Sequence, residues 1–329
     1  MQDEQIAIIG GSGFVGSRLT QYFQESKTNF QIYDLNCDGE NSHFLDLNQT
    51  SSFSVLEGST CIINLAAEHR DDVRPISKYD EVNVEGSRRI CNAARKYQIN
   101  KILFTSSVAI YGFAPPGTDE SGEPNYFNDY GRTKWLAEKV YKEWYDEDPI
   151  NRSLIIIRPT VIFGENNRGN VYNLFNQIHK KRFVMIGDGK NVKSMAYVGN
   201  VAAFISYCIK NIQEFEVFNY VDSPDLDMNS LIKIVRKKLF NKANVGLRLP
   251  LILGRILGTF FSIISKISGL SFPISSIRVK KFVSTTQFDA SKAHQSGFIA
   301  PYSLSEGVEN TLTNDFLSKE KPKKIFYSE

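Results

Sequence analysis

Gly10-Gly-Ser-Gly13-Phe-Val-Gly16 is the stretch that decides the fold, because it connects a short apolar run, Ile6–Ile9, to a helical pattern over residues 15–25. A glycine-rich turn in this position lets the backbone approach a pyrophosphate closely, and the start of the following helix supplies unpaired N–H groups. The glycines fit both GxGxxG, counted from Gly11, and GxxGxxG, counted from Gly10. The order of strand, glycines and helix predicts a dinucleotide site, although the alternative is a plain glycine-rich loop.

Short apolar runs alternate with helical patterns along the first part of the chain. The predicted strands are Ile6–Ile9, Phe30–Tyr33, Cys61–Leu65, Lys101–Phe104 and Ser153–Ile157; the predicted helices cover residues 15–25, 82–97 and the segment after Tyr130. This alternation is typical of a parallel sheet with helices on both faces. We therefore predict an α/β fold with a doubly wound, Rossmann-type sheet.

From about residue 170 the order of elements becomes mixed, which predicts a smaller C-terminal substrate lobe. A helix is expected at residues 171–181 and a return segment at residues 195–210, with less regular structure from Ser223 onward. The predicted dinucleotide-binding domain is 1–170 plus 195–222, the substrate lobe is 171–194 plus 223–318, and the tail is 319–329.

Composition narrows the class of protein. A chain of 329 residues with 42% hydrophobic residues suits a globular enzyme, and a net charge of +3 is too small to indicate a nucleic-acid partner. The four cysteines are scattered without a CxxC pair and none has a histidine at ligand spacing, so we expect reduced thiols and no metal site. The acidic start, Met1-Gln-Asp-Glu-Gln5, does not resemble a signal peptide and favours a cytoplasmic protein.

Asp34 ends the second predicted strand, eighteen residues after Gly16. A carboxylate in this position hydrogen-bonds the adenosine ribose hydroxyls and repels a 2′-phosphate, which favours NAD over NADP. The alternative is a solvated aspartate at the end of a strand. Asp46-Leu47 and Leu65-Ala-Ala67 fall where such folds contact the adenosine side of the cofactor, although Ala66 and Ala67 would also suit an ordinary core.

Tyr130 and Lys134 are one helical turn apart, so both side chains lie on one face of the predicted helix. A tyrosine with an ordinary pKa near ~10 needs a drop of about three units to act as a base near neutrality. A nearby ammonium and a positively charged nicotinamide ring both favour the phenolate. The YxxxK pattern alone is weak. Ser107, with Ser106 as the neighbouring candidate, ends a strand at the sheet edge where ligands bind, and Ser107 could share a proton with Tyr130.

Several strings together resemble the extended short-chain dehydrogenase/reductase family of sugar-nucleotide epimerases and dehydratases. They are Gly10–Gly16, Asn64-Leu-Ala-Ala67, Asn83-Val-Glu-Gly86, Thr105-Ser-Ser-Val-Ala-Ile-Tyr-Gly112, Tyr130–Lys134, Arg158-Pro-Thr-Val-Ile-Phe-Gly164, Phe288-Asp-Ala-Ser-Lys-Ala293 and Tyr302-Ser-Leu-Ser-Glu-Gly307. The resemblance implies that Ser107, Tyr130 and Lys134 are catalytic. It also implies a cofactor held by Gly10, Gly13, Phe14, Val15, Gly16 and Pro159, together with Tyr130 and Lys134.

The residues after Ser107 select among the reactions of this family. The dehydratases carry an Asp-Glu pair there to expel water, whereas this chain has Val108-Ala109, which cannot exchange a proton. A net reductase would use exchangeable NADPH, which Asp34 disfavours. The remaining reaction is redox-neutral 4-epimerisation with NAD, in which a hydride leaves C4 of the sugar and returns to the opposite face.

The charge of the chain is unevenly distributed. Residues 228–288 contain eleven Lys and Arg residues and no Asp or Glu. Within this span, residues 249–266 are strongly apolar but too interrupted, by Arg255 and Lys266, for a membrane span of about 20 apolar residues. A basic, apolar helix can lie on an anionic membrane surface with Phe260-Phe261 inserted. A helix buried in the lobe or in a dimer contact is the alternative.

A closer resemblance concerns the carrier of the sugar. Residues 66–72, 163–173, 193–198 and 277–281 are similar to bacterial epimerases that convert undecaprenyl-diphosphate-linked N-acetylglucosamine to N-acetylgalactosamine in surface-polysaccharide (O-antigen) assembly. Asn170 matches the diphosphate-side asparagine of the family, and Lys193 stands where an Arg-Asp-Phe/Tyr stretch is usual; both are expected to contact substrate. Glu68, His69 and Arg70 lie near the expected sugar site without an assigned role, and a solvated loop is the alternative.

The resemblance implies a lipid-linked sugar diphosphate as substrate, a location on the inner face of the cell membrane and a homodimer formed through the helices at residues 82–97 and 130–144. Two other functions stay open at this stage. One is a soluble 4-epimerase of UDP-N-acetylglucosamine or UDP-glucose, with the same chemistry on a different carrier. The other is a non-catalytic NAD-binding protein on the same fold.

Overall fold

The computed structural model describes residues 5–37, 39, 41–70, 73–268, 276–320, 322 and 324–327. Parts of four sequence predictions lie outside this range: residues 1–4 of the acidic start, Asp71 and Asp72 of the string after the fourth strand, residues 269–275 of the basic apolar span, and residues 321, 323, 328 and 329 of the tail. The side chains of residues 261–268, 277 and 278 of the basic apolar span, Phe261 among them, are not among the described parts either.

The core of the molecule is a seven-stranded sheet with the strand order β11-β6-β5-β4-β1-β2-β3. All neighbouring strands in it are parallel. Its strands are β1 (Ile6–Ile9), β2 (Phe30–Asp34), β3 (Ser42–Phe44), β4 (Cys61–Asn64), β5 (Lys101–Thr105), β6 (Ser153–Pro159) and β11 (Phe215–Tyr220). This order confirms the predicted Rossmann-type, doubly wound sheet.

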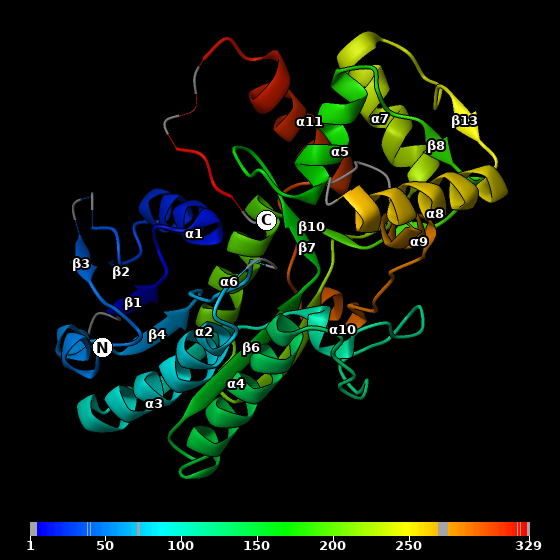
Figure 1. The fold of residues 1–329 in the computed structure, drawn as a ribbon. Helices are drawn as coiled ribbons and strands as arrows, with labels where there is room; N and C mark the ends of the chain where they lie inside the picture. Colours follow the sequence, from blue (N-terminus) through cyan, green and yellow to red (C-terminus); the bar gives the residue numbers. More distant parts are fainter. Residues whose placement is uncertain are drawn as a thin grey trace.

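Helices cover both faces of the sheet (Figure 1). On one face, α1 (Phe14–Glu25) and α6 (Val198–Asn211) pack against side chains such as Ile8 and Ile63. On the other face, α3 (Gly86–Tyr97) and α4 (Asp129–Asp146) pack against side chains such as Ile9 and Ile62. Because neighbouring residues of a strand point to opposite faces, strands buried on both sides must be apolar throughout, as the short runs in the sequence are.

A third apolar cluster lies outside the main sheet and joins segments far apart in the chain. It brings together α5 (Asn170–His179), α7 (Met228–Phe240) and α11 (Leu304–Leu312), with side chains such as Phe175, Ile232 and Val308 fully buried. Next to it lie β8 (Met185–Ile186), β13 (Arg248–Leu249), α8 (Leu251–Ser268) and α9 (Ser276–Val283), at the upper right of Figure 1.

The expectation of less regular structure from Ser223 onward is wrong. Asp227 caps the start of α7, since its carboxylate accepts a hydrogen bond from the N–H of Ser230 at 2.7 Å, and buried residues at helical spacing follow it. The structure also contains β11, an edge strand that the sequence analysis did not identify. The remaining elements are η1 (Thr50–Leu56), α2 (Ser77–Tyr79), η2 (Asp80–Glu85), η3 (Val108–Tyr111), β7 (Val161–Phe163), β9 (Val192–Lys193), β10 (Met195–Tyr197), β12 (Leu226–Asp227), α10 (Ser291–Gln295) and η4 (Thr313–Leu317).

Candidate active site

A cleft of about 840 Å³ opens at the carboxyl ends of the parallel strands, where ligands of such sheets bind. Every residue predicted as catalytic, cofactor-binding or substrate-binding lines this one cleft. These residues are Gly10, Gly13, Phe14, Val15, Gly16, Asp34, Asp46, Leu47, Leu65, Ala66, Ala67, Ser106, Ser107, Tyr130, Lys134, Pro159, Asn170 and Lys193. The fold thus brings together positions up to 183 residues apart in the chain, from Gly10 to Lys193.

The geometry of the glycine loop decides between the two possible spacings. Gly10 has a φ of +81°, and a Cβ on it would lie 2.7 Å from the backbone nitrogen of Ala66. A Cβ on Gly16 would lie 2.4 Å from the carbonyl oxygen of Gly10. Gly10, Gly13 and Gly16 line the cleft, whereas a Cβ on Gly11 would meet Ile32 in the core. The loop therefore presents the GxxGxxG spacing to the cleft.

The start of α1 faces the same cleft. Among the described residues no side chain caps this helix, whose N-cap is Gly13. Its first N–H groups and the positive end of its dipole are thus directed at the cleft beside a loop that leaves room for a ligand close to the backbone. This arrangement fits a bound pyrophosphate.

Asp34 lines the cleft at the end of β2, which lies three strands away from β5 in the sheet. One carboxylate oxygen accepts a hydrogen bond from the N–H of Ser12 at 3.0 Å, and the other accepts one from the N–H of Asn36 at 3.4 Å. These bonds orient the carboxylate beside the glycine loop. Asp46 is held similarly, since its carboxylate accepts from the N–H of Asn48 at 2.9 Å.

Tyr130 and Lys134 project from the first turns of α4, which begins at a well-formed cap. The side chain of Asn128 accepts a hydrogen bond from the N–H of Gly131 at 2.9 Å. The Lys134 ammonium donates to the backbone carbonyl of Thr105 at 2.7 Å and lies 5.9 Å from the centre of the Tyr130 ring. The Ser107 hydroxyl, at the start of η3, accepts from the N–H of Ala109 at 3.1 Å. The cap and the end of β5 hold the three side chains at one place in the cleft.

Burial has the largest effect on the pKa values of Tyr130 and Lys134. It raises the pKa of Tyr130 to about 12, against the lowering effect of a hydrogen bond with Ser107. Burial also lowers the pKa of Lys134 to about 7, against the raising effect of Glu138. Burial therefore moves the pKa of Tyr130 away from the value that a base near neutrality needs. Positive charge brought into the cleft by a ligand would move it back.

Three buried hydroxyl groups lie at the carboxyl ends of the strands, in the lining of the cleft. The Oγ atom of Ser106 and the Oγ1 atoms of Thr105 and Thr160 are buried, and none has a hydrogen-bond partner among the described residues. All three residues line the cleft. A buried polar atom without a partner is costly, so these hydroxyls fit a polar ligand at this position. Sequence reasoning missed Thr105 and Thr160, although both follow strand residues at the sheet edge.

Polar side chains hold the loop after β4. Asn83 accepts from the N–H of Glu68 at 2.8 Å and donates to its carbonyl at 2.9 Å, while it also donates to the Thr133 hydroxyl at 3.0 Å. Glu68 and His69 line the cleft. Arg70 does not line it, and its backbone carbonyl accepts a hydrogen bond from the Tyr79 hydroxyl. Of the three loop residues without an assigned role, two therefore face the ligand space.

Lys193 is partly engaged by the protein itself. Its ammonium donates to the backbone carbonyl of Lys281 at 2.8 Å and to that of Ser284, at the end of α9. Burial lowers its pKa to about 8. Its side chain lines the cleft while it holds α9 in place beside it.

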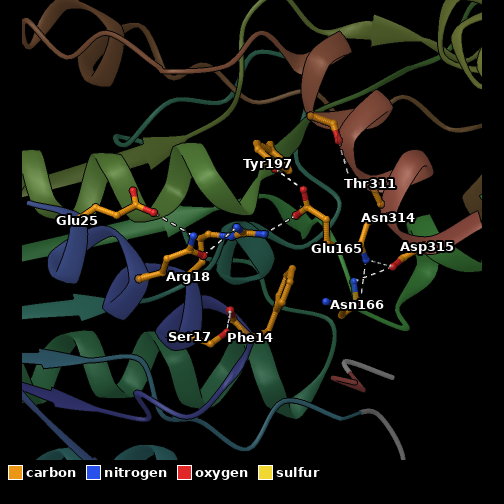
Figure 2. A network of polar contacts seen from close by, with 12 residues as sticks. Phe14, Ser17, Arg18, Glu25, Glu165, Asn166, Tyr197, Thr311, Asn314 and Asp315 are labelled. Carbon is orange, nitrogen blue, oxygen red and sulfur yellow. Dashed lines mark hydrogen bonds and ion pairs between the residues drawn. The ribbon is translucent and has the colours of Figure 1, made fainter. Parts of the chain in front are cut away.

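Two polar contacts join α1 to β10 through the carboxylate of Glu165. Figure 2 shows Arg18 of α1 and Tyr197 of β10 directed at Glu165; the Glu165 carboxylate accepts from both, at 2.6 Å each. In the same view Asn166 meets Asp315, whose carboxylate accepts from the Asn166 N–H at 2.9 Å. The two walls of the cleft are thus linked by charge and hydrogen bonds.

The described residues 324–327 of the C-terminal tail return to the glycine loop. The Lys324 ammonium donates to the carbonyl of Ser12 at 2.8 Å, and the Phe326 ring lies 5.7 Å from the Phe14 ring. The Phe326 N–H donates to Asn166 at 2.9 Å, and its carbonyl accepts from Arg168 at 2.7 Å. The tail therefore braces the cofactor loop against the segment after β7.

The fold and the cleft define a dinucleotide-binding enzyme with a tyrosine, a lysine and a serine at the reactive end. Residues 6–220 match the NAD dependent epimerase/dehydratase family, and the chain belongs to that family. Its cofactor is NAD. The crowded glycines at the start of α1 and the unpartnered hydroxyls at the strand ends both fit this cofactor.

Among curated relatives, the chain is 48% identical to the N-acetyl-alpha-D-glucosaminyl-diphospho-ditrans,octacis-undecaprenol 4-epimerase of Escherichia coli O157:H7, over 99% of this chain and 100% of that protein. It is 24% identical to the UDP-glucose 4-epimerase of Vibrio cholerae, over 94% of each. Among solved structures, the UDP-N-acetylglucosamine 4-epimerase of Bacillus cereus matches with a TM-score of 0.75 at 16% identity, over 97% of this chain and 99% of that one. The last likeness shows that the fold is shared.

Proposed function

We propose that the protein is a 4-epimerase that interconverts N-acetylglucosamine and N-acetylgalactosamine on undecaprenyl diphosphate, in surface-polysaccharide (O-antigen) assembly. The observation that carries the reaction is the meeting of Ser107, Tyr130 and Lys134 in one cleft with the glycine loop. The full-length similarity to the Escherichia coli O157:H7 enzyme supports the substrate.

In this proposal Tyr130 is the group that exchanges a proton with the sugar. Bound NAD supplies the hydride chemistry at C4. The Tyr130 oxygen takes the proton of the C4 hydroxyl as the C4–H bond breaks, which gives a 4-keto sugar, and returns it after the sugar has turned over. The Lys134 ammonium stabilises the phenolate and holds the nicotinamide ribose, and Ser107 hydrogen-bonds the C4 oxygen.

The other predicted site residues receive positioning roles. Gly10, Gly13 and Gly16 with Phe14 and Val15 hold the pyrophosphate, and Asp34 holds the adenosine ribose. Asp46, Leu47 and residues 65–67 contact the adenosine side, and Pro159 contacts the nicotinamide side. Ser106 binds the sugar, while Asn170 and Lys193 lie toward the diphosphate. Residues 171–194 plus 223–318 form the substrate lobe in this proposal, and 1–170 plus 195–222 the cofactor domain.

The residues next to Ser107 support epimerisation over dehydration. Val108 and Ala109 line the cleft directly after the Ser107 hydroxyl. Hydrocarbon side chains there offer no proton donor to a leaving hydroxyl and no acceptor for a proton of the sugar. Elimination of water would need an acid at this place.

The exposed face of α8 supports attachment to the cytoplasmic surface of the membrane. Ile252, Ile256 and Phe260 are 73%, 59% and 55% exposed, and at spacings of four residues they share one face with Leu253 and Leu257. Behind this stripe Gly254 packs on Ile186, since a Cβ there would lie 2.5 Å from that side chain. Nearby cations such as Arg248 and Arg255 suit anionic headgroups.

Within the described ranges, none of the helices combines the length and hydrophobicity needed to cross a bilayer. The proposed attachment is accordingly a shallow one, with the stripe inserted about 5–10 Å into the interface. A homodimer through α3 and α4 is part of the same proposal and rests on the family resemblance alone.

The decisive experiment offers the purified protein N-acetylglucosamine on undecaprenyl diphosphate and on UDP, and follows the C4 epimer of each. We expect turnover of the lipid-linked sugar to exceed that of UDP-N-acetylglucosamine by orders of magnitude in kcat/KM. Efficient turnover of the UDP-linked sugar alone would replace the proposal with a nucleotide-sugar epimerase. NAD binding without turnover of either would identify a non-catalytic NAD-binding protein.

A further inference from the structure

Two phenylalanines with exposed rings stand at the mouth of the cleft. Phe113 and Phe127 are 64% and 51% exposed, and their rings stack with centres 4.9 Å apart. Both line the cleft, and they lie on the two segments that also carry Ser107 and Tyr130. Large exposed aromatic side chains beside a cleft mark a binding surface, because they leave apolar area in water until a ligand covers it.

Cations surround this pair. The Lys281 ammonium lies 5.6 Å from the centre of the Phe127 ring, and the Lys280 ammonium lies 6.0 Å from that of Phe113. Lys281 lines the cleft and is fixed by Lys193, which donates to its backbone carbonyl. The acidic residues among those that line the cleft are Asp34, Asp46 and Glu68. They belong to β2 and to the loops after β3 and β4, so the side of the mouth formed by α9 is positively charged.

The ring faces of the pair are already engaged. Each ring stacks on the other and has an ammonium over it, so a flat nucleobase would have to displace these contacts in order to stack. Phe113 and Phe127 remain largely exposed despite these contacts, and a flexible hydrocarbon chain can cover that apolar area without a particular orientation to a ring face. This favours an aliphatic ligand over uracil.

The aromatic pair lies near the elements that carry the apolar stripe of α8. Lys280 and Lys281 lie on α9, and α9 packs against α8, which exposes Ile252, Ile256 and Phe260. The helix that supplies the two cations is therefore in direct contact with the helix proposed for membrane attachment.

We propose that Lys281 and the stacked Phe113–Phe127 pair form a subsite for a polyprenyl diphosphate, in which Lys281 binds the diphosphate and the two rings hold the first isoprenoid units. This inference rests on the proposed function, because it places the carrier of that substrate. Lys193, which donates to the backbone carbonyl of Lys281 at 2.8 Å, adds a second positive charge beside this subsite.

The proposed contact between Lys281 and the diphosphate is tested with Lys281→Ala, Lys281→Arg and the matched surface control Lys237→Ala on α7. The substrate is N-acetylglucosamine on a short, water-soluble geranyl diphosphate. Loss of one charge-assisted contact should raise KM about tenfold with kcat nearly unchanged. Lys281→Arg should restore most of the affinity, and Lys237→Ala should match wild type. An unchanged KM in Lys281→Ala would remove Lys281 from the subsite.

The proposed contact between the two rings and the isoprenoid chain is tested with the Phe113→Ala/Phe127→Ala double variant. The carriers used increase in length from methyl to geranyl diphosphate. In wild type KM should fall roughly tenfold or more with the added isoprenoid units, and the double variant should lose this dependence. NAD content and the thermal unfolding midpoint report whether the variant is folded. If KM depended on carrier length equally in wild type and in the double variant, the two rings would not bind the isoprenoid chain.

The outcomes separate this inference from the proposed function. Absence of turnover of any lipid-linked sugar by wild type would refute the proposed function. Turnover of lipid-linked sugar that is indifferent to Lys281 and to both rings would refute the subsite alone. A larger loss for UDP-N-acetylglucosamine than for the geranyl substrate in the double variant would show that the rings bind the base, which also overturns the inference.

Discussion

Arg158 and Glu138 form a two-pronged ion pair in the interior, with N–O distances of 3.0 and 2.6 Å, between β6 and α4, the helix that carries Tyr130 and Lys134. Both side chains are buried, at 7% and 3% exposure. Glu138 stands one turn after Lys134 on the same helix, and Arg158 also donates to the Tyr111 hydroxyl at 2.6 Å. The pair joins the reactive helix to the sheet.

We predict that Glu138→Gln lowers the free energy of unfolding by about 3–5 kcal/mol, because it leaves a buried guanidinium without its counter-charge. Urea unfolding measures the loss. The exposed Lys142–Asp146 pair on the same helix gives the control, since Asp146→Asn should cost at most about 0.5 kcal/mol. Equal losses of unfolding free energy in the two variants would show that the buried pair stabilises the fold no more than the exposed pair does.

Tyr130→Phe should leave NAD bound while turnover falls by several orders of magnitude, because the substitution removes the oxygen that exchanges the proton and keeps the ring. Ser107→Ala should cost less, roughly 10²-fold in kcat. Steady-state rates and the NAD content of each variant are the measurements. If Tyr130→Phe kept more than about a tenth of the activity, another group would have to carry the proton.

The buried Lys134 predicts a specific dependence of stability on pH in the NAD-free protein. Its pKa falls from 10.5 to about 7 on folding, so between these values the unfolded chain binds more protons than the folded one. Stability due to this group therefore rises with pH from about 7 to about 10.5 and is lost as pH falls through that window.

The comparison with Lys134→Met isolates this contribution. Lys193, whose pKa is lowered to about 8, contributes with the same sign in both proteins. The difference in unfolding free energy between Lys134→Met and wild type should therefore shrink steadily from pH 7 to pH 9.5 in urea titrations. A difference that stays constant over this range would mean that Lys134 keeps an ordinary pKa.

Asp34 predicts the identity of the cofactor released on denaturation. We expect NAD or NADH, because a carboxylate held by the N–H of Ser12 repels a 2′-phosphate. Asp34→Ala should lower the preference for NAD over NADP about tenfold or more, measured by titration of the NAD-free protein. Recovery of NADP from wild type would overturn both the assignment and the redox-neutral mechanism.

The stripe on α8 predicts binding to anionic liposomes that weakens with salt but does not vanish, since each nearby cation contributes roughly 1 kcal/mol and the inserted apolar groups resist salt. Ile256→Ser/Phe260→Ser should release the protein while NAD remains bound. Ile150→Ser, at a side chain 92% exposed elsewhere on the surface, is the control. Binding that survives the double substitution would contradict attachment through this stripe.

Sequence reasoning succeeded for features that short local patterns determine. The glycine run and the apolar strands predicted the sheet, the cofactor and the family, and these predictions are confirmed. The roles of the individual site residues and the division into two domains stay predictions. The spacing of the glycines could not be assigned from the sequence, because it depends on contacts with distant residues: a Cβ on Gly10 would meet Ala66, whereas one on Gly11 would meet Ile32.

Features that depend on contacts between distant segments were not predictable. The strand Phe215–Tyr220 became recognisable only beside β6, its partner in the sheet. Burial, which no local pattern encodes, raises the pKa of Tyr130 in the ligand-free cleft, and the lowering expected from a positively charged nicotinamide ring stays a prediction. Phe113, Phe127 and Lys281 lie more than 150 residues apart at the extremes, and their meeting follows from the packing of α9.

The contact between Lys324 and Ser12 spans 312 residues of sequence. During synthesis the glycine loop and α1 are therefore made well before Lys324, whose side chain contacts them. The first βαβ unit must form its local structure without this contact, and the glycine loop reaches its braced arrangement only when the distant segment docks on it.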